Sequence, residues 1–383
     1  MMALEDLFQS FRKVADHPAD QLKKFKSEGK KVIGCMPYYV PEELVYASGM
    51  VPMGMWGTHN KTISMAREYC TSFYCSLAQL DLEMLLDGTL DDLDGVLLTV
   101  LCDTLRPMSQ NIRVAMEKEH KMSTIFMAHA QNRTKEYGKE FMMDQYRQIL
   151  DALEKICGHE ITQEQISEAI RVYNESRKAR RLFVKLAGQH PEAVSARNRS
   201  AVLKSAYFMP KDEHTTLLNQ VNEALQALPP SNFQGVKVVT SGIICDAPEL
   251  LEIFDRNQIA IAADDVAHES RAIRVDVPEA DDPIRALAEQ WALQDYDVLL
   301  YDEASSQNRR GEYVAQLAKE SGAQGVVVLM MVFCDPEEME YPSLKKALDE
   351  ADVPHIKVGI EMQTQQFGQI ETALQALADQ VSL

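Results

Sequence analysis

The sequence predicts an α/β protein of two units, each built on a parallel β-sheet, which a helical segment joins. Three observations lead to this prediction. Short apolar runs alternate with helical stretches over residues 1–133, strand patterns disappear over 134–230, and the alternation returns over 231–383. Such alternation is typical of parallel sheets that helices cover on both faces. We therefore expect a first α/β domain, a helical connecting segment and a second α/β domain with these bounds.

The first unit is predicted to open with one amphipathic helix over residues 1–28 and to continue with alternating strands and helices. A helix over 41–49 has Pro41 near its start and Gly49 at its end, which is the usual asymmetry of helix termini. Another helix is expected over 76–88. The predicted strands cover residues 31–36, 50–57, 95–103 and 122–129.

The connecting segment shows two long helical patterns, over 134–160 and 162–188, of which Gly188 is expected to close the second. Two further helices should follow before the break at Pro229 and Pro230. In the second unit we expect a helix over residues 248–257 and a last helix from about residue 366. The predicted strands there cover residues 236–245, 258–264, 297–302, 326–334 and 354–360.

Composition narrows the class of protein. Of 383 residues, 46% are hydrophobic and 25% are charged, which is typical of a soluble globular enzyme. No apolar run reaches the roughly 18 residues of a membrane helix. The N-terminus, MMALEDLFQSFRK, is amphipathic and begins acidic, unlike a signal peptide. We therefore expect a cytoplasmic protein that does not bind membranes.

The charge balance disfavours nucleic acid as a partner. Asp and Glu number 58 against 39 Lys and Arg, for a net charge of −19, whereas nucleic-acid binding depends on cation–phosphate contacts. A phosphate-bearing ligand would need a local basic patch. The richest runs from Arg177 to Arg181 with Lys185, followed by Arg197 and Arg199. A solvated helix face is the favoured interpretation of this patch.

Several common catalytic motifs are missing from the sequence. No GxGxxG follows a strand, and GxxxxGK[ST], GxSxG and HExxH do not occur. An ordinary nucleotide or zinc enzyme is therefore not indicated. The sequence has seven cysteines, an odd number, and no Cys-x-x-Cys motif. A disulfide framework is therefore not expected. The cysteines remain as buried thiols, a nucleophile, or ligands of a soft metal centre.

Three cysteines lie at or near strand-to-helix turns: Cys75, Cys102 and Cys334. In a parallel sheet these turns gather at the carboxyl edge, where ligands bind. If the carboxyl edges of the two sheets face each other, the three thiols can meet, and three thiolates suit an iron–sulfur cluster with an open or non-cysteine fourth position. Plain packing and a single nucleophile remain the alternatives. Cys157 is interpreted as packing, and Cys35, Cys70 and Cys245 are ambiguous.

Two other features are open to more than one interpretation. Asp264, Asp265 and His268 follow a strand and suit acid–base catalysis, helix capping or inter-domain hydrogen bonds, of which capping or another structural role is favoured. Trp56 closes a strand and is interpreted as a core residue rather than as the wall of a cofactor cleft.

Six segments together resemble the 2-hydroxyacyl-CoA dehydratases, over essentially the whole chain. The resemblance implies two Rossmann-like domains with a [4Fe-4S] cluster between them, held by three cysteines. Carried over residue by residue, these are Cys75 of FYCS, Cys102 of LCDTL and Cys334 of FCDPEE, with Cys70 as the likeliest source of a wrong assignment. The segments are KVIGCMPYYVPEELVYASGMVPMGMWG, EYCTSFYCS, LLTVLCDTLRPMSQN, SGIICDAPELL, IAADDVAHESR and MMVFCDPEEMEYPSLKKAL.

The resemblance also implies an activity and partners. It implies the iron–sulfur subunit of a heterodimeric hydro-lyase that removes water from a 2-hydroxyacyl-CoA by a ketyl-radical mechanism. The implied partners are a homologous α subunit with its own cluster, an ATP-dependent iron–sulfur activator that delivers one electron, and the acyl-CoA substrate. Some members of the family carry a flavin (FMN or riboflavin), which no residue here demonstrates. A benzoyl-CoA-type reductase subunit and a metal-free scaffold subunit are the alternatives.

Overall fold

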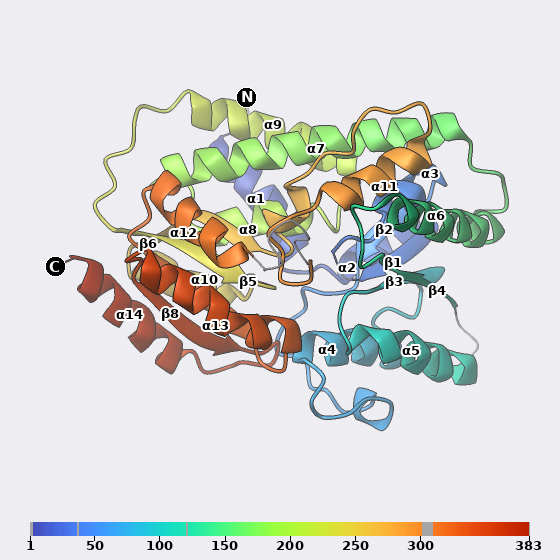
Figure 1. Cartoon of the computed structure of the whole chain (residues 1–383), viewed down its shortest axis with the longest axis horizontal. Coiled ribbons are helices and arrows are strands. Elements are labelled where there is room, and N and C mark those ends of the chain that lie inside the picture. Colours follow the sequence, from blue (N-terminus) through green and yellow to red (C-terminus); the bar gives the residue numbers. More distant parts are fainter. Residues whose placement is uncertain (1–2, 37, 120–121, 301–308, 383) are drawn as a thin grey trace.

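The computed structural model describes residues 3–36, 38–119, 122–300 and 309–382, and it contains two four-stranded sheets (Figure 1). The first has the strand order β2-β1-β3-β4 and the second the order β6-β5-β7-β8. Every strand pair in both sheets is parallel. The predicted fold class, α/β with two Rossmann-like parallel sheets, is confirmed.

The first sheet follows the predicted order of strands and helices. Gly49 after α3 and Gly88 after α4 have positive φ angles of 76° and 87°, the left-handed conformation that glycine adopts at helix ends. The strands are β1 (Val32–Met36), β2 (Val51–Gly54), β3 (Gly95–Val100) and β4 (Ser123–Ala128), and the helices are α3 (Glu42–Ala47), η1 (Ala66–Glu68), α4 (Ser76–Leu86) and α5 (Leu105–Glu119).

The N-terminal segment differs from the single helix predicted over residues 1–28. It forms two helices, α1 (Leu4–Ala15) and α2 (Asp20–Ser27), while residues 1 and 2 lie outside the described part. Pro18 lies between the two helices. Its ring lacks a backbone donor and disfavours helical geometry at the preceding residue, so the helix breaks there.

Four helices lie between the two sheets in sequence. They are α6 (Glu136–Cys157), α7 (Gln163–Gln189), α8 (Ala196–Ser205) and α9 (Lys211–Gln226). The longest, α7, starts at a capping box of Thr162 and Gln165 and runs above both sheets in Figure 1. Gly188 lies inside this helix rather than after it. A Cβ at that position would come within 2.1 Å of the Ala262 carbonyl oxygen, so the glycine is needed for the packing of α7 on β6.

The second sheet contains β5 (Val236–Gly242), β6 (Ile259–Val266), β7 (Gly325–Met331) and β8 (His355–Ile360). Around it lie α10 (Pro248–Arg256), α12 (Arg310–Ser321), α13 (Asp335–Glu350) and α14 (Gly368–Ser382), with η2 (Arg271–Ile273) after β6. The helix α11 (Pro283–Leu293) instead packs on α6 and α7, beside the first sheet. Among the described residues, none of the helices is both long and apolar enough to span a bilayer.

The prediction of a strand over residues 297–302 is wrong for the residues of it that the structure describes. Residues 297–300 form a turn, and residues 301 and 302 lie outside the described residues. The carboxylate of Asp297 accepts a hydrogen bond from the backbone N–H of Leu299 at 3.0 Å. This side-chain turn competes with strand formation.

The two sheets share one hydrophobic core. Its largest cluster combines Met53 and Leu98 of the first sheet with Val238, Leu329 and Val358 of the second. Because this core is continuous, the carboxyl ends of strands from both sheets are held at a fixed separation, which sets the geometry of the site between them.

Candidate metal centre

Cys75, Cys102 and Cys334 line one cavity of about 70 Å³. Cys75 is the N-cap residue of α4 and Cys334 is the N-cap residue of α13. Cys102 lies after β3, and its carbonyl accepts a hydrogen bond from Arg106 in the first turn of α5. Two of the thiols therefore come from the first sheet and the third from the second. The structure brings together the three cysteines that the sequence singled out.

Each of the three thiols faces backbone N–H groups at a helix start. Burial raises the pKa of Cys75 to about 12, and the N–H groups of Ala78 and Leu77 oppose that rise. Burial also raises the pKa of Cys102 and of Cys334, again against nearby backbone N–H groups. Without a metal the thiols are therefore neutral at pH 7, whereas a coordinated thiol is deprotonated outright.

The three side chains of this cavity that bear on a metal centre are soft sulfur donors. Within the described ranges, no three His, Cys, Asp or Glu side chains are grouped closely enough to hold one metal ion. In a [4Fe-4S] cube each thiolate binds a different iron atom, so the thiols must surround a cavity rather than converge on a point. Three soft sulfur ligands around one cavity fit such a cluster.

The other four cysteines do not line this cavity. The Cys70 thiol donates to the carbonyl of Ala66 at 3.0 Å, within the loop that carries η1. Cys157 donates to backbone carbonyls at the end of α6, as expected for a packing residue. Cys35 and Cys245 are buried, and Cys35 lines a neighbouring cavity.

Two exposed aromatic side chains adjoin the thiols. Phe73, two residues before Cys75, is 62% exposed, and Phe333, directly before Cys334, is 43% exposed. Phe333 also has a φ angle of +64°, which a bulky residue rarely adopts. Strained backbone of this kind clusters at functional sites.

A smaller cavity of about 30 Å³ adjoins the three-cysteine cavity, and the sequence does not predict it. It is lined by Asp81, which is 0% exposed, and neither of its carboxylate oxygens has a hydrogen-bond partner among the described residues. Burial raises the pKa of Asp81 well above its usual range, which favours the protonated carboxyl group. Trp56 lines the same cavity and packs against Tyr207 and His268, so it is both a core and a wall residue.

The two acids in the last part of β6, Asp264 and Asp265, have structural roles. Asp264 accepts hydrogen bonds from the backbone of Val266 and Ser270 and forms an ion pair with Arg199. Asp265 forms buried ion pairs with three arginines, which hold its pKa well below the usual range despite its burial. These contacts agree with the favoured interpretation of capping and structure.

The same arginine network reaches the three-cysteine cavity. Glu337, in the first turn of α13, lines that cavity and forms ion pairs with Arg271 and Arg310, both at 3.3 Å. All three side chains are buried. The start of α13, and with it the position of Cys334, is therefore fixed by buried ion pairs to η2 and α12.

Comparison with known proteins gives matches along nearly the whole chain. Residues 37–381 match the family described as 2-hydroxyglutaryl-CoA dehydratase, D-component. The chain is 56% identical to the β subunit of (R)-2-hydroxyglutaryl-CoA dehydratase from Acidaminococcus fermentans, over 99% of this chain and 100% of the relative. It is 41% identical to the β subunit of (R)-phenyllactyl-CoA dehydratase from Clostridium sporogenes, over 98% of each chain. Its identity to one of the subunits of benzoyl-CoA reductase from Thauera aromatica is 25%, over 96% of this chain and 95% of the relative.

Proposed function

Since the chain belongs to the 2-hydroxyglutaryl-CoA dehydratase D-component family, we propose that it is the iron–sulfur subunit of a heterodimeric 2-hydroxyacyl-CoA dehydratase. The proposed reaction removes water from (R)-2-hydroxyglutaryl-CoA to give glutaconyl-CoA. The observation that supports it most is the cavity that Cys75, Cys102 and Cys334 line together, although they come from three separate turns of two sheets. The 56% identity to a subunit of that enzyme supports the choice of substrate.

We propose that these three thiols hold a [4Fe-4S] cluster. When bound, the cluster supplies one-electron transfer, with a potential set by net charge, hydrogen bonds to sulfur and solvent access. This chain's own residues fix those conditions. Backbone N–H groups of Ala78, Leu77, Leu105 and Thr104 face the sulfurs of Cys75 and Cys102. We do not extend the proposal to a flavin.

Addition of a single electron to the substrate would make the β hydrogen acidic enough for this dehydration. The hydrogen on the β carbon is not acidic, because a thioester activates the α carbon instead. One electron added to the thioester carbonyl gives a ketyl radical that expels the α hydroxyl as hydroxide. The resulting enoxyl radical has an acidic β hydrogen, and loss of that proton gives a second ketyl. That ketyl releases the electron again and leaves the enoyl-CoA.

The proposal includes two protein partners. A homologous α subunit would bind the substrate, and an ATP-dependent iron–sulfur activator would deliver the electron, while this chain would relay or store it. Two relatives of this chain are named as β subunits of dehydratases, which supports an α-type partner. The exposed ring of Phe333, which lines the three-cysteine cavity, and that of Phe73, two residues before Cys75 in sequence, offer apolar surface for such contacts.

Iron and acid-labile sulfide, measured on protein purified without oxygen, test the proposal. We expect about four iron atoms per chain and their loss in Cys334→Ser. With the α subunit and activator present, dehydration of (R)-2-hydroxyglutaryl-CoA should be lost as well. The matched control is Cys157→Ser, since that thiol lies at the end of α6 and outside the cavity. Unchanged iron and activity in Cys334→Ser would remove that residue from the ligand set.

The same preparations separate the two alternatives. Reduction of benzoyl-CoA without dehydration of the hydroxyacyl thioester would indicate a benzoyl-CoA-type reductase subunit, with which the chain shares lower identity. Absence of iron from the chain alone, together with no more iron in its complex than the α subunit itself carries, would indicate a scaffold subunit.

A further inference from the structure

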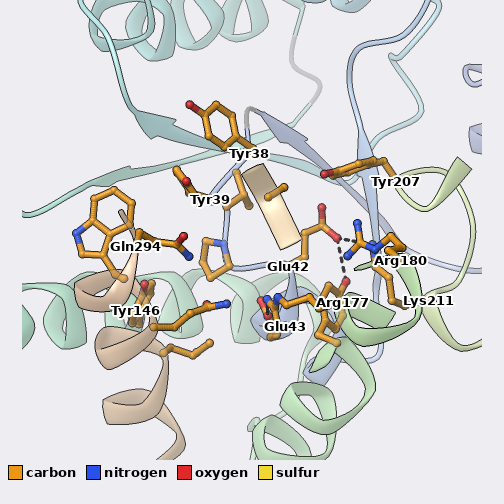
Figure 2. A pocket seen from close by; sticks show the side chains of 17 residues that line it. Tyr38, Tyr39, Glu42, Glu43, Tyr146, Arg177, Arg180, Tyr207, Lys211 and Gln294 are labelled. Carbon is orange, nitrogen blue, oxygen red and sulfur yellow. Dashed lines mark hydrogen bonds and ion pairs between the residues drawn. The ribbon is translucent and has the colours of Figure 1, made fainter. Parts of the chain in front are cut away.

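A separate polar cavity of about 70 Å³ lies among α3, α7, α9 and α11, and the proposed function does not use it (Figure 2). Three cationic side chains line it: Arg177, Arg180 and Lys211. Two carboxylates, Glu42 and Glu43, line it as well. Four of these five side chains are buried, so their charges are largely removed from water. Glu42 is the exception.

Both carboxylates of the cavity already have a cation. Glu42 accepts a hydrogen bond from the Tyr173 hydroxyl at 3.1 Å and pairs with Lys211 at 2.9 Å. Glu43 forms a hydrogen-bonded ion pair with Arg177. Each of the two acids therefore forms an ion pair with one cation. No acid of the cavity forms an ion pair with the third cation, Arg180.

Arg180 differs from the other buried arginines of the described part. It is 5% exposed, and it makes a long hydrogen bond of 3.5 Å from Nε to the Ser176 carbonyl and a cation–π contact with Tyr207 at 5.9 Å. Burial and the nearby charge of Arg177 lower the pKa of Arg180, while Tyr207 and Glu42 act in the opposite direction. The other five buried arginines each have a carboxylate within 4.0 Å: Arg133, Arg177, Arg199, Arg271 and Arg310.

A buried polar atom without a hydrogen-bond partner among the described residues lies on the opposite side of the cavity. Figure 2 shows Gln294 across the pocket from Arg180. The side-chain oxygen of Gln294 is buried and has no hydrogen-bond partner among the residues that the structure describes. Leaving a buried acceptor unpaired costs about 1–3 kcal/mol, so this oxygen favours a ligand that donates a hydrogen bond.

We propose that this cavity binds a small carboxylate anion that also carries a hydrogen-bond donor, in the size range of a short hydroxy acid. Its carboxylate would bind the guanidinium of Arg180, and its hydroxyl would donate to the oxygen of Gln294. A charge-assisted bond to a planar guanidinium is among the stronger polar contacts. Water alone would satisfy Gln294 but would bring no negative charge to Arg180.

The size and position of the cavity restrict the ligand further. Pockets for drug-sized molecules measure roughly 300–1,000 Å³, so about 70 Å³ excludes a nucleotide or a coenzyme A moiety. Tyr38 lines this cavity, the small cavity at Asp81 and the three-cysteine cavity. The three cavities therefore adjoin at Tyr38, and none of the three thiols lines the anion site.

Titration calorimetry with lactate on the full-length protein at pH 7 tests this site. We expect a Kd of about 10 mM or tighter. Lactamide, which has no charge, should bind at least about tenfold more weakly. Propanoate, which lacks the hydroxyl, should bind about threefold more weakly, as expected for one lost neutral hydrogen bond. Absence of binding, or equal binding of lactate and lactamide, would overturn the proposal, and equal binding of propanoate would overturn the role of Gln294.

Substitution of Arg180 locates the binding. Arg180→Gln should weaken lactate binding at least about tenfold, and Arg180→Lys should keep part of it. The control Arg171→Gln changes an exposed arginine of the same helix, whose partners are Glu168 and Glu175, and should leave binding unchanged. Lactate binding that persists in Arg180→Gln would place the anion elsewhere and refute the proposal.

Folding of the variant is controlled by thermal denaturation. Because Arg180 has no carboxylate partner among the described residues, its neutral replacement leaves no acid unpaired, and Arg180→Gln should melt no lower than the wild-type protein. Saturating lactate should raise the Tm of the wild-type protein and not that of Arg180→Gln. Equal Tm shifts in both proteins would contradict the assignment independently of calorimetry.

Discussion

The hydroxyl of Ser76 accepts a hydrogen bond from the backbone N–H of Met362 at 2.9 Å. Ser76 directly follows Cys75, whereas Met362 comes just after β8, the last strand of the second sheet. The same hydroxyl donates to the sulfur of Met331 at 3.3 Å. The turn that presents Cys75 is thus attached to the other sheet by a buried side chain.

Ser76→Ala should lower the free energy of unfolding by about 1–3 kcal/mol, because it leaves the N–H of Met362 buried without an acceptor. Urea denaturation measures this change. Thr216→Ala, on the exposed surface of α9, is the control and should change stability by less than about 0.5 kcal/mol. Equal stability of Ser76→Ala and the wild-type protein would show that water replaces the lost acceptor.

Cys70→Ser should keep the iron content of the wild-type protein, whereas Cys75→Ser should lose it. Only five positions separate the two thiols, but Cys70 donates to Ala66 and does not line the three-cysteine cavity. Iron analysis after anaerobic purification makes the comparison. Loss of iron in Cys70→Ser with retention in Cys75→Ser would reverse the assignment.

Asp81→Asn should remove a pH dependence of stability. The pKa of Asp81 is raised in the folded protein by burial, while it is about 3.9 in the unfolded chain. Above about pH 4 the unfolded chain releases a proton that the folded protein retains, so the stability of the wild-type protein falls with rising pH, by up to about 1.4 kcal/mol per pH unit.

Denaturant titrations from pH 3 to pH 8 check this sign. The difference between Asp81→Asn and the wild-type protein should vanish near pH 3 and grow toward pH 8. Asp151→Asn, at an exposed position of α6, provides the matched control and should run parallel to the wild-type protein. Parallel curves for Asp81→Asn would mean that Asp81 is ionised in the folded state.

Gly188→Ala should destabilise the protein by about 1–3 kcal/mol, because the new methyl group would overlap the carbonyl of Ala262 and push α7 away from β6. Thermal and urea denaturation report the loss. Gly368→Ala, at a position with no atom within 4 Å of the new Cβ, should be neutral or slightly stabilising. A neutral Gly188→Ala would show that α7 can shift without cost.

Local patterns predicted the strands and the thiol positions well. The apolar run before Cys334 forms β7, and the runs before Cys102 and after Lys30 form β3 and β1. Parallel topology then places the following turns at the same edges, which is why the three cysteines were identified without contact information. The domain bounds at residues 133 and 230 and the role of the thiols as cluster ligands stay predictions.

Other features depend on contacts between distant residues. The basic patch, which comprises Arg177 to Arg181, Lys185, Arg197 and Arg199, is predicted to be a solvated face. This is wrong for Arg177, Arg180 and Arg199, which are buried. Arg177 and Arg180 are three residues apart and share the buried face of α7, whereas Lys178 is exposed. The carboxylate partner of Arg177, Glu43, lies 134 residues away in sequence. No local pattern encodes such pairs, and the same holds for the cavity at Asp81.

Because the three thiols are distributed over two sheets, they are synthesised at widely separated times. Cys334 lies 232 positions after Cys102. At 5–20 residues per second, a ribosome needs roughly 10–50 s to cover that distance. Throughout this interval the nascent chain has two of the three thiols and lacks the strand β7 that positions the third. The three-cysteine cavity is therefore completed only near the end of translation, after most of the chain has left the ribosome.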